Sequence, residues 1–248
     1  MSDQPRLQGR LQDCTAVILM GGLGTRLRSV VCDRPKPLAQ VNGRPFITYL
    51  LDQLADTGLQ RVVLCTGYMG DMVEVVLGQI WRSLELIYSP ESMPLGTGGA
   101  LRLAAPHLQS ATALVMNGDS YCDVDWATLW TQHQRSPQGC TIVLTQVQNV
   151  QRFGQVTLNT SQQVIQFAEK GQNSGSGWIN AGIYLLPVAA IAALPAHQHC
   201  SLETDLLTQQ VAHRQLRGVR TQGLFIDIGL PDSYQQAQSL MRDIKLQC

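Results

Sequence analysis

Lysine is scarce in this 248-residue chain. Of its 18 lysine and arginine side chains only Lys36, Lys170 and Lys245 are lysines, and 18 acidic side chains bring the formal net charge to zero. A neutral chain without a basic block lacks the surface by which nucleic-acid binders neutralise many phosphates. Any binding of phosphate groups must therefore be confined to a local site.

Membrane, secretion and disulfide patterns are missing as well. No apolar run approaches the ~20 residues that a membrane span requires, and residues 1–13 are polar, unlike a signal peptide. The seven cysteines are scattered and include no Cys-x-x-Cys pair, so they indicate neither a disulfide framework nor a zinc ribbon. We expect a soluble, cytoplasmic protein with reduced thiols, whose partners include neither a membrane nor a nucleic acid.

Strand and helix patterns alternate through the first part of the chain. Short apolar runs typical of strands buried on both faces of a sheet occur at 15–20, 61–66, 84–89 and 113–117. Helical patterns lie at 45–58, 71–78 and 100–105. This alternation predicts right-handed crossovers and a parallel sheet.

The pattern changes after residue 146. A hairpin is predicted at 154–158 and 164–169, further strands at 178–185 and 216–221, and helices at 202–213 and from 232. We find no internal repeat and no linker. The chain is therefore predicted to form a single α/β domain, Rossmann-like and doubly wound, with a mostly parallel mixed sheet.

The densest chemical signal follows the first apolar run. It consists of GGLGTRL at 21–27 and PKP at 35–37. Glycines let backbone N–H groups approach an anion closely, Arg26 adds a fork for phosphate oxygens, and Lys36 adds a point charge. The chain has no Gly-Lys for a Walker A loop, and Leu27 occupies the third glycine position of the dinucleotide pattern.

This compound motif resembles the signature of the sugar-nucleotide pyrophosphorylases, nucleotidyltransferases that join a nucleoside triphosphate to a sugar 1-phosphate. The resemblance extends from residue 15 to about residue 234. It implies a GT-A-like nucleotidyltransferase fold, Mg²⁺ as cofactor, and an NTP and a sugar 1-phosphate as substrates. It also implies a tail at 1–13, a nucleotide-binding half at 14–146, a sugar-phosphate-binding half at 147–234 and a C-terminal helix at 235–248.

The resemblance assigns nucleotide binding to the glycine loop, to the second glycine segment PLGTGGA at 94–100, and to two strand ends. The expected nucleotide-binding residues are Leu19, Gly21, Gly22, Gly24, Thr25, Arg26, Lys36, Gly67, Tyr68, Gly96, Thr97, Gly98, Asn117 and Gly118. An E-K pair and an N-A-G segment supply the expected sugar-phosphate-binding residues Glu169, Lys170, Asn180 and Gly182. Taken alone, the second glycine segment is also compatible with an ordinary strand-to-helix loop, and Tyr68 with an exposed loop tyrosine.

Asp119 and Asp227 resemble the two metal-binding aspartates of the family. Each follows an apolar strand, where an aspartate by itself is usually a turn former. Together with the glycine loops they suit Mg²⁺, which takes one or two carboxylates plus phosphate oxygens. Parallel sheets bind their ligands beyond the carboxyl ends of the strands, where both aspartates are expected.

The expected reaction is attack by an oxygen of the sugar 1-phosphate on the α-phosphorus, with pyrophosphate leaving. The attacking phosphate, with a second pKa near ~6, is ionised at neutral pH, so no general base is required. Catalysis then rests on positioning and charge stabilisation, with Arg26, Lys36 and Asp119 as the expected catalytic residues.

Base and sugar are indicated by overall likeness. The segments at 25–31, 35–46 and 94–99 are most similar to the short guanylyltransferases of the family that act on a heptose 1-phosphate, which favours GTP. Leu230 departs from the threonine common in relatives at the rim of the site. Mannose 1-phosphate guanylyltransferase, a thymidylyl- or uridylyltransferase acting on a hexose 1-phosphate, and a catalytically silent regulatory subunit that binds nucleotide sugars stay open as alternatives. A homo-oligomer is compatible with the sequence.

Two further clusters have simpler explanations. His197, His199 and Cys200 are zinc-ligand types, but no further ligands lie near them in the sequence, so zinc is not expected. Trp126 and Trp130 lie four residues apart on a predicted helix and are expected to pack against the core.

Overall fold

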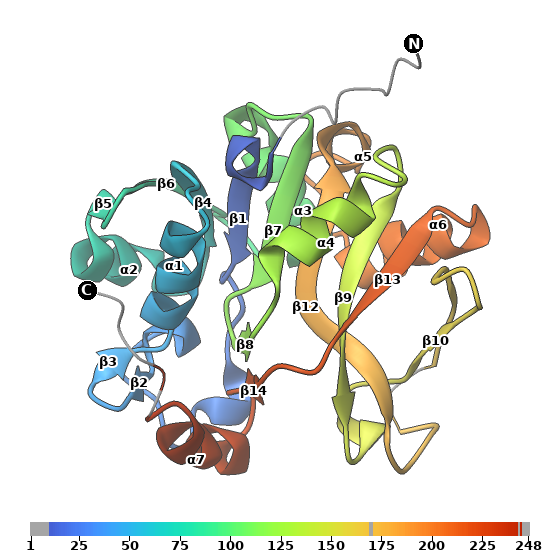
Figure 1. The fold of residues 1–248 in the computed structure, drawn as a ribbon. Coiled ribbons are helices and arrows are strands. Elements are labelled where there is room, and N and C mark those ends of the chain that lie inside the picture. The colour runs from blue at the N-terminus through green and yellow to red at the C-terminus, as the bar shows by residue number, and fades with distance from the viewer. Residues whose placement is uncertain (1–9, 169–170, 243, 245–248) are drawn as a thin grey trace.

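The computed structural model describes residues 10–168, 171–242 and 244. Its central sheet consists of β1 (Thr15–Leu19), β4 (Arg61–Thr66), β5 (Ile80–Trp81), β6 (Leu84–Pro90), β7 (Thr112–Asn117), β9 (Cys140–Val147), β12 (Gly177–Pro187) and β13 (Leu216–Thr221). Their order is β13-β9-β12-β7-β1-β4-β6-β5, which Figure 1 shows from right to left. β12 runs antiparallel to both neighbours and β5 runs antiparallel to β6, whereas the other pairs are parallel. The predicted mostly parallel mixed sheet is confirmed.

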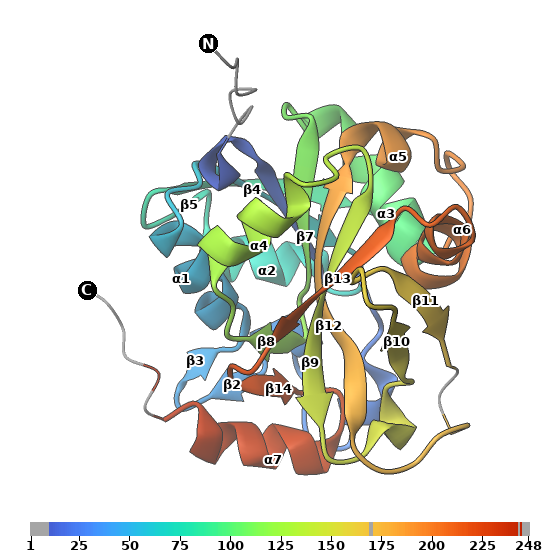
Figure 2. The same cartoon turned by 45° about the vertical axis from the view of Figure 1, so that its right-hand side comes forward.

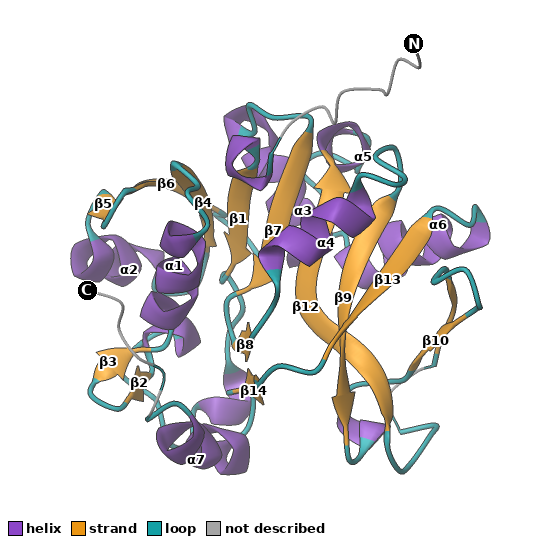
Figure 3. Cartoon of the chain, viewed as in Figure 1, coloured by secondary structure: helices purple, strands orange, loops and turns teal. Residues whose placement is uncertain are grey.

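Helices cover both faces of this sheet (Figures 2 and 3). One face carries α1 (Ile47–Asp56), α2 (Gly70–Leu77) and α4 (Trp126–His133), and the other carries α3 (Gly96–Ala104), α5 (Val188–Ala192) and the π-helix η6 (Leu202–Leu207), continued by α6 (Thr208–Ala212). Side chains alternate along a strand, so Ile18 of β1 packs in the α1 cluster, whereas Val17 and Leu19 pack in the α3 cluster. A strand buried on both faces requires a continuous apolar run, as residues 15–20 provide.

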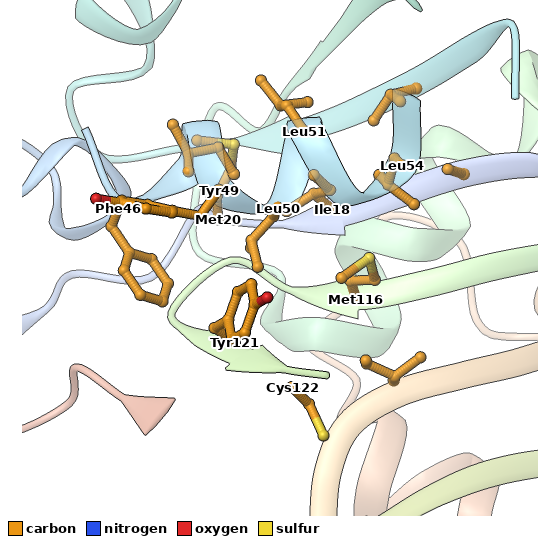
Figure 4. Packing of buried hydrophobic residues seen from close by; sticks show 14 of the residues in the cluster. Ile18, Met20, Phe46, Tyr49, Leu50, Leu51, Leu54, Met116, Tyr121 and Cys122 are labelled. Atoms are coloured by element: carbon orange, nitrogen blue, oxygen red, sulfur yellow. The ribbon is translucent and has the colours of Figure 1, made fainter. Parts of the chain in front are cut away.

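The packing of α1 shows how the sequence pattern becomes a core. Leu50, Leu51 and Leu54 lie on one face of this helix and are fully buried. Figure 4 shows α1 lying over Ile18 of β1, with Met116 of β7 close by. Each buried leucine contributes about 1.5–3 kcal/mol relative to leaving it exposed. Trp126 and Trp130 of α4 pack against the same cluster, as predicted.

The smaller elements gather mainly beyond the carboxyl ends of β1 and β7 (Figure 1). They include the hairpin of β2 (Gln40–Val41) and β3 (Arg44–Pro45), the pair of β8 (Ser120–Cys122) and β14 (Phe225–Asp227), and α7 (Pro231–Leu240). The short 3-10 helices are η1 (Leu11–Asp13), η2 (Thr25–Leu27), η3 (Lys36–Leu38), η4 (Ala105–His107) and η5 (Val150–Arg152). The predicted hairpin in the second half is β10 (Val156–Leu158) with β11 (Val164–Phe167), antiparallel to each other.

The predicted start of the helix at 100–105 is wrong. The glycine segment, expected as a loop before a helix at 100–105, forms the first turns of α3, which begins at Gly96. Gly98 and Gly99 donate their N–H groups to the Cys200 carbonyl at 2.8 and 3.1 Å. A partner more than 90 residues away in the sequence therefore fixes where this helix starts.

None of the helices in the described part is both long and apolar enough to cross a bilayer. The division into a nucleotide-binding half and a sugar-phosphate-binding half stays a prediction.

Candidate active site

The first glycine loop leaves the carboxyl end of β1 and passes close to two other segments. A Cβ on Gly21 would lie 2.5 Å from Glu91 Oε1, so a side chain there would push the Glu91 carboxylate aside. Gly24 has φ +60°, a left-handed conformation that glycine adopts without steric cost, and it precedes η2. At Gly24 the loop therefore takes a backbone conformation in which most other residues would be strained.

This loop forms one wall of a pocket of about 400 Å³. Four segments far apart in the sequence contribute predicted site residues to its lining. These residues are Leu19, Gly21, Gly22, Gly24, Thr25, Arg26, Lys36, Gly96, Thr97, Asn117, Gly118 and Asp119. They meet because parallel strands present their carboxyl ends at the same edge of the sheet.

Three predicted nucleotide-binding residues do not line the pocket, and two of them, Gly67 and Gly98, lie behind its walls. Gly67 backs the glycine loop, where a Cβ would lie 2.7 Å from the Gly21 carbonyl oxygen. Gly98 backs α3, where a Cβ would lie 2.8 Å from Cys200 Sγ. Tyr68 is 38% exposed, and the Arg28 guanidinium lies over its ring at 4.6 Å.

The predicted sugar-phosphate-binding residues lie beside Asn117 or outside the described residues. Asn180 donates to the buried Tyr184 hydroxyl at 2.8 Å, and Asn117 is hydrogen bonded to the same hydroxyl. Gly182 has φ +78°, and a Cβ there would lie 2.7 Å from Asn117 Nδ2. The N-A-G segment therefore lies directly against the pocket floor. Glu169 and Lys170 lie outside the described residues.

Lys36 and Asp119 form an ion pair at the pocket wall. Lys36 Nζ donates to Asp119 Oδ2 at 2.6 Å, and the lysine side chain is only 10% exposed. Lys36 belongs to η3, where the flanking prolines restrict the backbone. The scarce lysine of the P-K-P motif is thus held opposite the first predicted metal-binding aspartate.

Asp227 is not one of the residues that line the pocket, but strand pairing holds it next to Asp119. It ends β14 and pairs with Ser120 of β8, the residue that follows Asp119. Burial raises the pKa of Asp227, the negative charge of Asp119 adds to this, and the cationic Lys36 and Arg152 together with the Gly229 N–H oppose it. Arg152 Nη2 donates to Asp227 Oδ1 at 3.0 Å. Two mutually repelling carboxylates are therefore held close together.

The two carboxylates fit a hard divalent cation. Among the described residues no group of three or more His, Cys, Asp or Glu side chains could hold a metal on its own. Magnesium needs no such group, because it keeps several waters and takes phosphate oxygens from its substrate. Gly229 supplies the necessary space, since a Cβ there would lie 2.8 Å from Asp227 Oδ1.

Sequence reasoning missed several residues that the fold brings to the site. Glu91 and His199 line the pocket, and Glu91 Oε2 accepts the Leu95 N–H at 3.0 Å. Arg152 reaches Asp227 from η5, and Tyr184 ties Asn117 to Asn180. For His199 the only sequence signal is its place in the His-x-His-Cys cluster, for which no zinc is expected.

Comparison with known proteins agrees with this geometry. Residues 15–243 match the family model described as nucleotidyl transferase. The chain belongs to the nucleotidyl transferase family. This membership confirms the sequence-based prediction of a nucleotidyltransferase fold and activity class. Members of the family typically use a divalent metal ion.

Individual family members are similar over most of their length. A D-glycero-alpha-D-manno-heptose 1-phosphate guanylyltransferase from Aneurinibacillus thermoaerophilus is 36% identical over 223 residues, which cover 90% of this chain and 96% of that protein. HddC from Yersinia pseudotuberculosis, solved also complexed with GMP-PN, is 33% identical with a TM-score of 0.80, covering 92% of this chain and 100% of that chain. A mannose-1-phosphate guanylyltransferase from Mycobacterium tuberculosis is 32% identical, covering 88% of this chain and 62% of that protein.

Proposed function

We propose that this nucleotidyltransferase makes GDP-heptose and pyrophosphate from GTP and D-glycero-α-D-manno-heptose 1-phosphate. The observation that carries the proposal is the pocket, in which the glycine loop, Lys36, Asn117 and Asp119 meet. The similarity to heptose 1-phosphate guanylyltransferases over nearly their whole length supports this choice of sugar.

The chemistry is an in-line displacement at the α-phosphorus. An oxygen of the sugar 1-phosphate forms the new bond, the bond from the α-phosphorus to the bridging oxygen breaks, and pyrophosphate leaves with that electron pair. The glycine loop and Arg26 hold the triphosphate, while Lys36 lies where it can stabilise the charge that develops on the phosphates. Asn180 and Gly182, with Lys170, bind the sugar 1-phosphate. The protein thus acts by orientation and electrostatics.

Mg²⁺ is the proposed cofactor, held by Asp119 and Asp227. When bound there it would neutralise phosphate charge next to the reacting centre. The protein's part is to hold the two carboxylates together, which the β8–β14 pairing does, and to leave the space beside Asp227 that Gly229 provides.

Glu91 supports guanine as the base. Its carboxylate lies half-buried at the pocket wall, and one oxygen already accepts the Leu95 N–H. An ionised carboxylate only accepts hydrogen bonds, and the Watson–Crick edge of guanine offers two adjacent donors, N1–H and the N2 amino group. Uracil and thymine offer a single donor on that edge. A carboxylate here therefore favours GTP over UTP and dTTP.

Pyrophosphate release from each of GTP, ATP, UTP and dTTP, paired with heptose, mannose and glucose 1-phosphates, tests the function. We expect the highest kcat/KM for GTP with heptose 1-phosphate. Glu91→Gln replaces an acceptor with a donor, and we expect it to lower kcat/KM for GTP about ten- to hundredfold while leaving that for UTP nearly unchanged.

The other outcomes separate the alternatives. Higher kcat/KM with mannose 1-phosphate would favour the mannose enzyme, the activity that the Mycobacterium relative is named for. Preference for UTP or dTTP would contradict both the base and the role of Glu91. No turnover with any pair, together with binding of a nucleotide sugar, would favour a silent regulatory subunit.

A further inference from the structure

Arg152 faces a predicted metal ligand from a distant part of the chain. It ends η5, and Nη2 donates to Asp227 Oδ1 at 3.0 Å across a separation of 75 residues. Its guanidinium lies over the Phe153 ring at 5.0 Å, and that ring packs edge-on against Phe225 of β14 at 5.8 Å. Phe153 also closes the turn by donating its N–H to the Val150 carbonyl at 2.9 Å. The aromatic packing of Phe153 and Phe225 therefore supports the Arg152–Asp227 contact from both elements, η5 and β14.

Each of the two aspartates is paired with one basic side chain. Asp119 is paired with Lys36 at 2.6 Å, and Asp227 is paired with Arg152 at 3.0 Å. A divalent cation bound by both carboxylates competes with these two side chains for the same negative charges. Each side chain displaced in this way becomes available to an anion at the edge of the site.

Once displaced from its aspartate, Arg152 can contact a different part of the site from Lys36. Lys36 lines the proposed nucleotide pocket, whereas Arg152 is not among the described residues that line it. Its side chain is 41% exposed, so it can turn without disturbing the core. A guanidinium suits phosphate because its planar fork binds two oxygens at once.

We propose that Arg152 is a switching anion anchor, which neutralises Asp227 in the free protein and binds the phosphate of the sugar 1-phosphate once a divalent cation takes that carboxylate. The identity of the anion rests on the proposed function, whereas the competition for Asp227 does not. The cation and the sugar 1-phosphate should consequently bind cooperatively, because the first releases the residue that the second needs.

The first test is the affinity of the free protein for Mn²⁺, measured by electron paramagnetic resonance. Arg152→Gln removes the competing charge, and we expect it to bind Mn²⁺ about fivefold more tightly than wild type. Arg220→Gln is the matched control, since the Arg220 guanidinium also lies 5.0 Å from an aromatic ring, that of Trp178. We expect it to leave the affinity for Mn²⁺ unchanged.

The second test is the Kd of heptose 1-phosphate at saturating Mn²⁺, measured by calorimetry. Arg152→Gln should raise it about tenfold, Arg152→Lys should recover part of the loss, and Arg220→Gln should have no effect. The Kd of GTP should change less than twofold.

Each measurement can overturn the inference. Unchanged or weaker Mn²⁺ binding by Arg152→Gln would refute the competition for Asp227. An unchanged Kd for heptose 1-phosphate, or a loss confined to GTP, would refute the anchor. Neither binding measurement requires turnover, so a wild-type protein that binds heptose 1-phosphate without converting it would overturn the proposed function and still leave both results decisive for Arg152.

Discussion

His133 offers a pH test of the fold. This residue of α4 is fully buried, its Nδ1 lies 2.9 Å from Thr141 Oγ1 of β9, and its Nε2 is without a hydrogen-bond partner in the described structure. Burial disfavours the charged imidazolium and lowers the pKa of His133 to about 4, from the 6.5 expected in the unfolded chain. Between these two values the unfolded chain binds a proton that the folded protein does not.

The sign of the effect follows from this difference. Stability from a neutral His133 is fully present above about pH 6.5 and is lost as the pH falls toward 4. A tenfold difference in proton affinity is worth about 1.4 kcal/mol, so the free energy of unfolding should fall by about 2 kcal/mol between pH 7 and pH 5 through this residue alone.

Urea unfolding of wild type and His133→Leu, each at pH 7 and pH 5, isolates the contribution of His133 to the free energy of unfolding. Other groups contribute equally to both proteins, whereas the leucine variant lacks this proton. We therefore expect the wild type to lose about 2 kcal/mol more than His133→Leu between pH 7 and pH 5. Equal losses would refute the reasoning, since they would mean that His133 is hydrated or already charged in the folded protein.

Lys36 and Gly96 both line the pocket, and substitutions at each have measurable consequences. Lys36→Met removes the cation beside Asp119 and should lower kcat on the order of 10²–10³-fold in the pyrophosphate assay, with near wild-type kcat refuting its catalytic role. Gly96→Ala should cost about 2–4 kcal/mol in urea unfolding, because Gly96 has φ +73° and a Cβ there would lie 2.6 Å from the Cys200 carbonyl oxygen. Gly43→Ala, at φ +79° with nothing within 4 Å, should cost only about 1–2 kcal/mol, and equal costs would refute the contact with Cys200.

Much of the architecture could be read from local patterns. The apolar run at 15–20 became the fully buried β1, and the leucines spaced along α1 became its core face. These predictions succeed because strand and helix periodicities are local properties of the chain. The start of α3 was missed because glycine disfavours helix, and hydrogen bonds to the distant Cys200 outweigh that preference.

Some residues of the candidate site were predicted from motifs, whereas others are brought there only by the fold. Motif residues such as Gly21, Thr97 and Asp119 were predicted, and the fold brings them to one pocket. Glu91 was missed because it carries no motif signal, and only the fold brings it to the pocket wall, where it accepts the Leu95 N–H. Glu169 and Lys170 lie outside the described residues, so their role stays a prediction.

By itself the sequence determined the family, the alternation of elements and the two lysine-bearing motifs, because each is written in contiguous residues. Only the tertiary structure decided which charges meet. Asp119 and Asp227 become neighbours through the β8–β14 pairing, and Lys36 and Arg152 become their counter-ions. Electrostatic interactions depend on distance in space, and the folded chain closes gaps of 83 residues for Lys36–Asp119 and 75 for Arg152–Asp227.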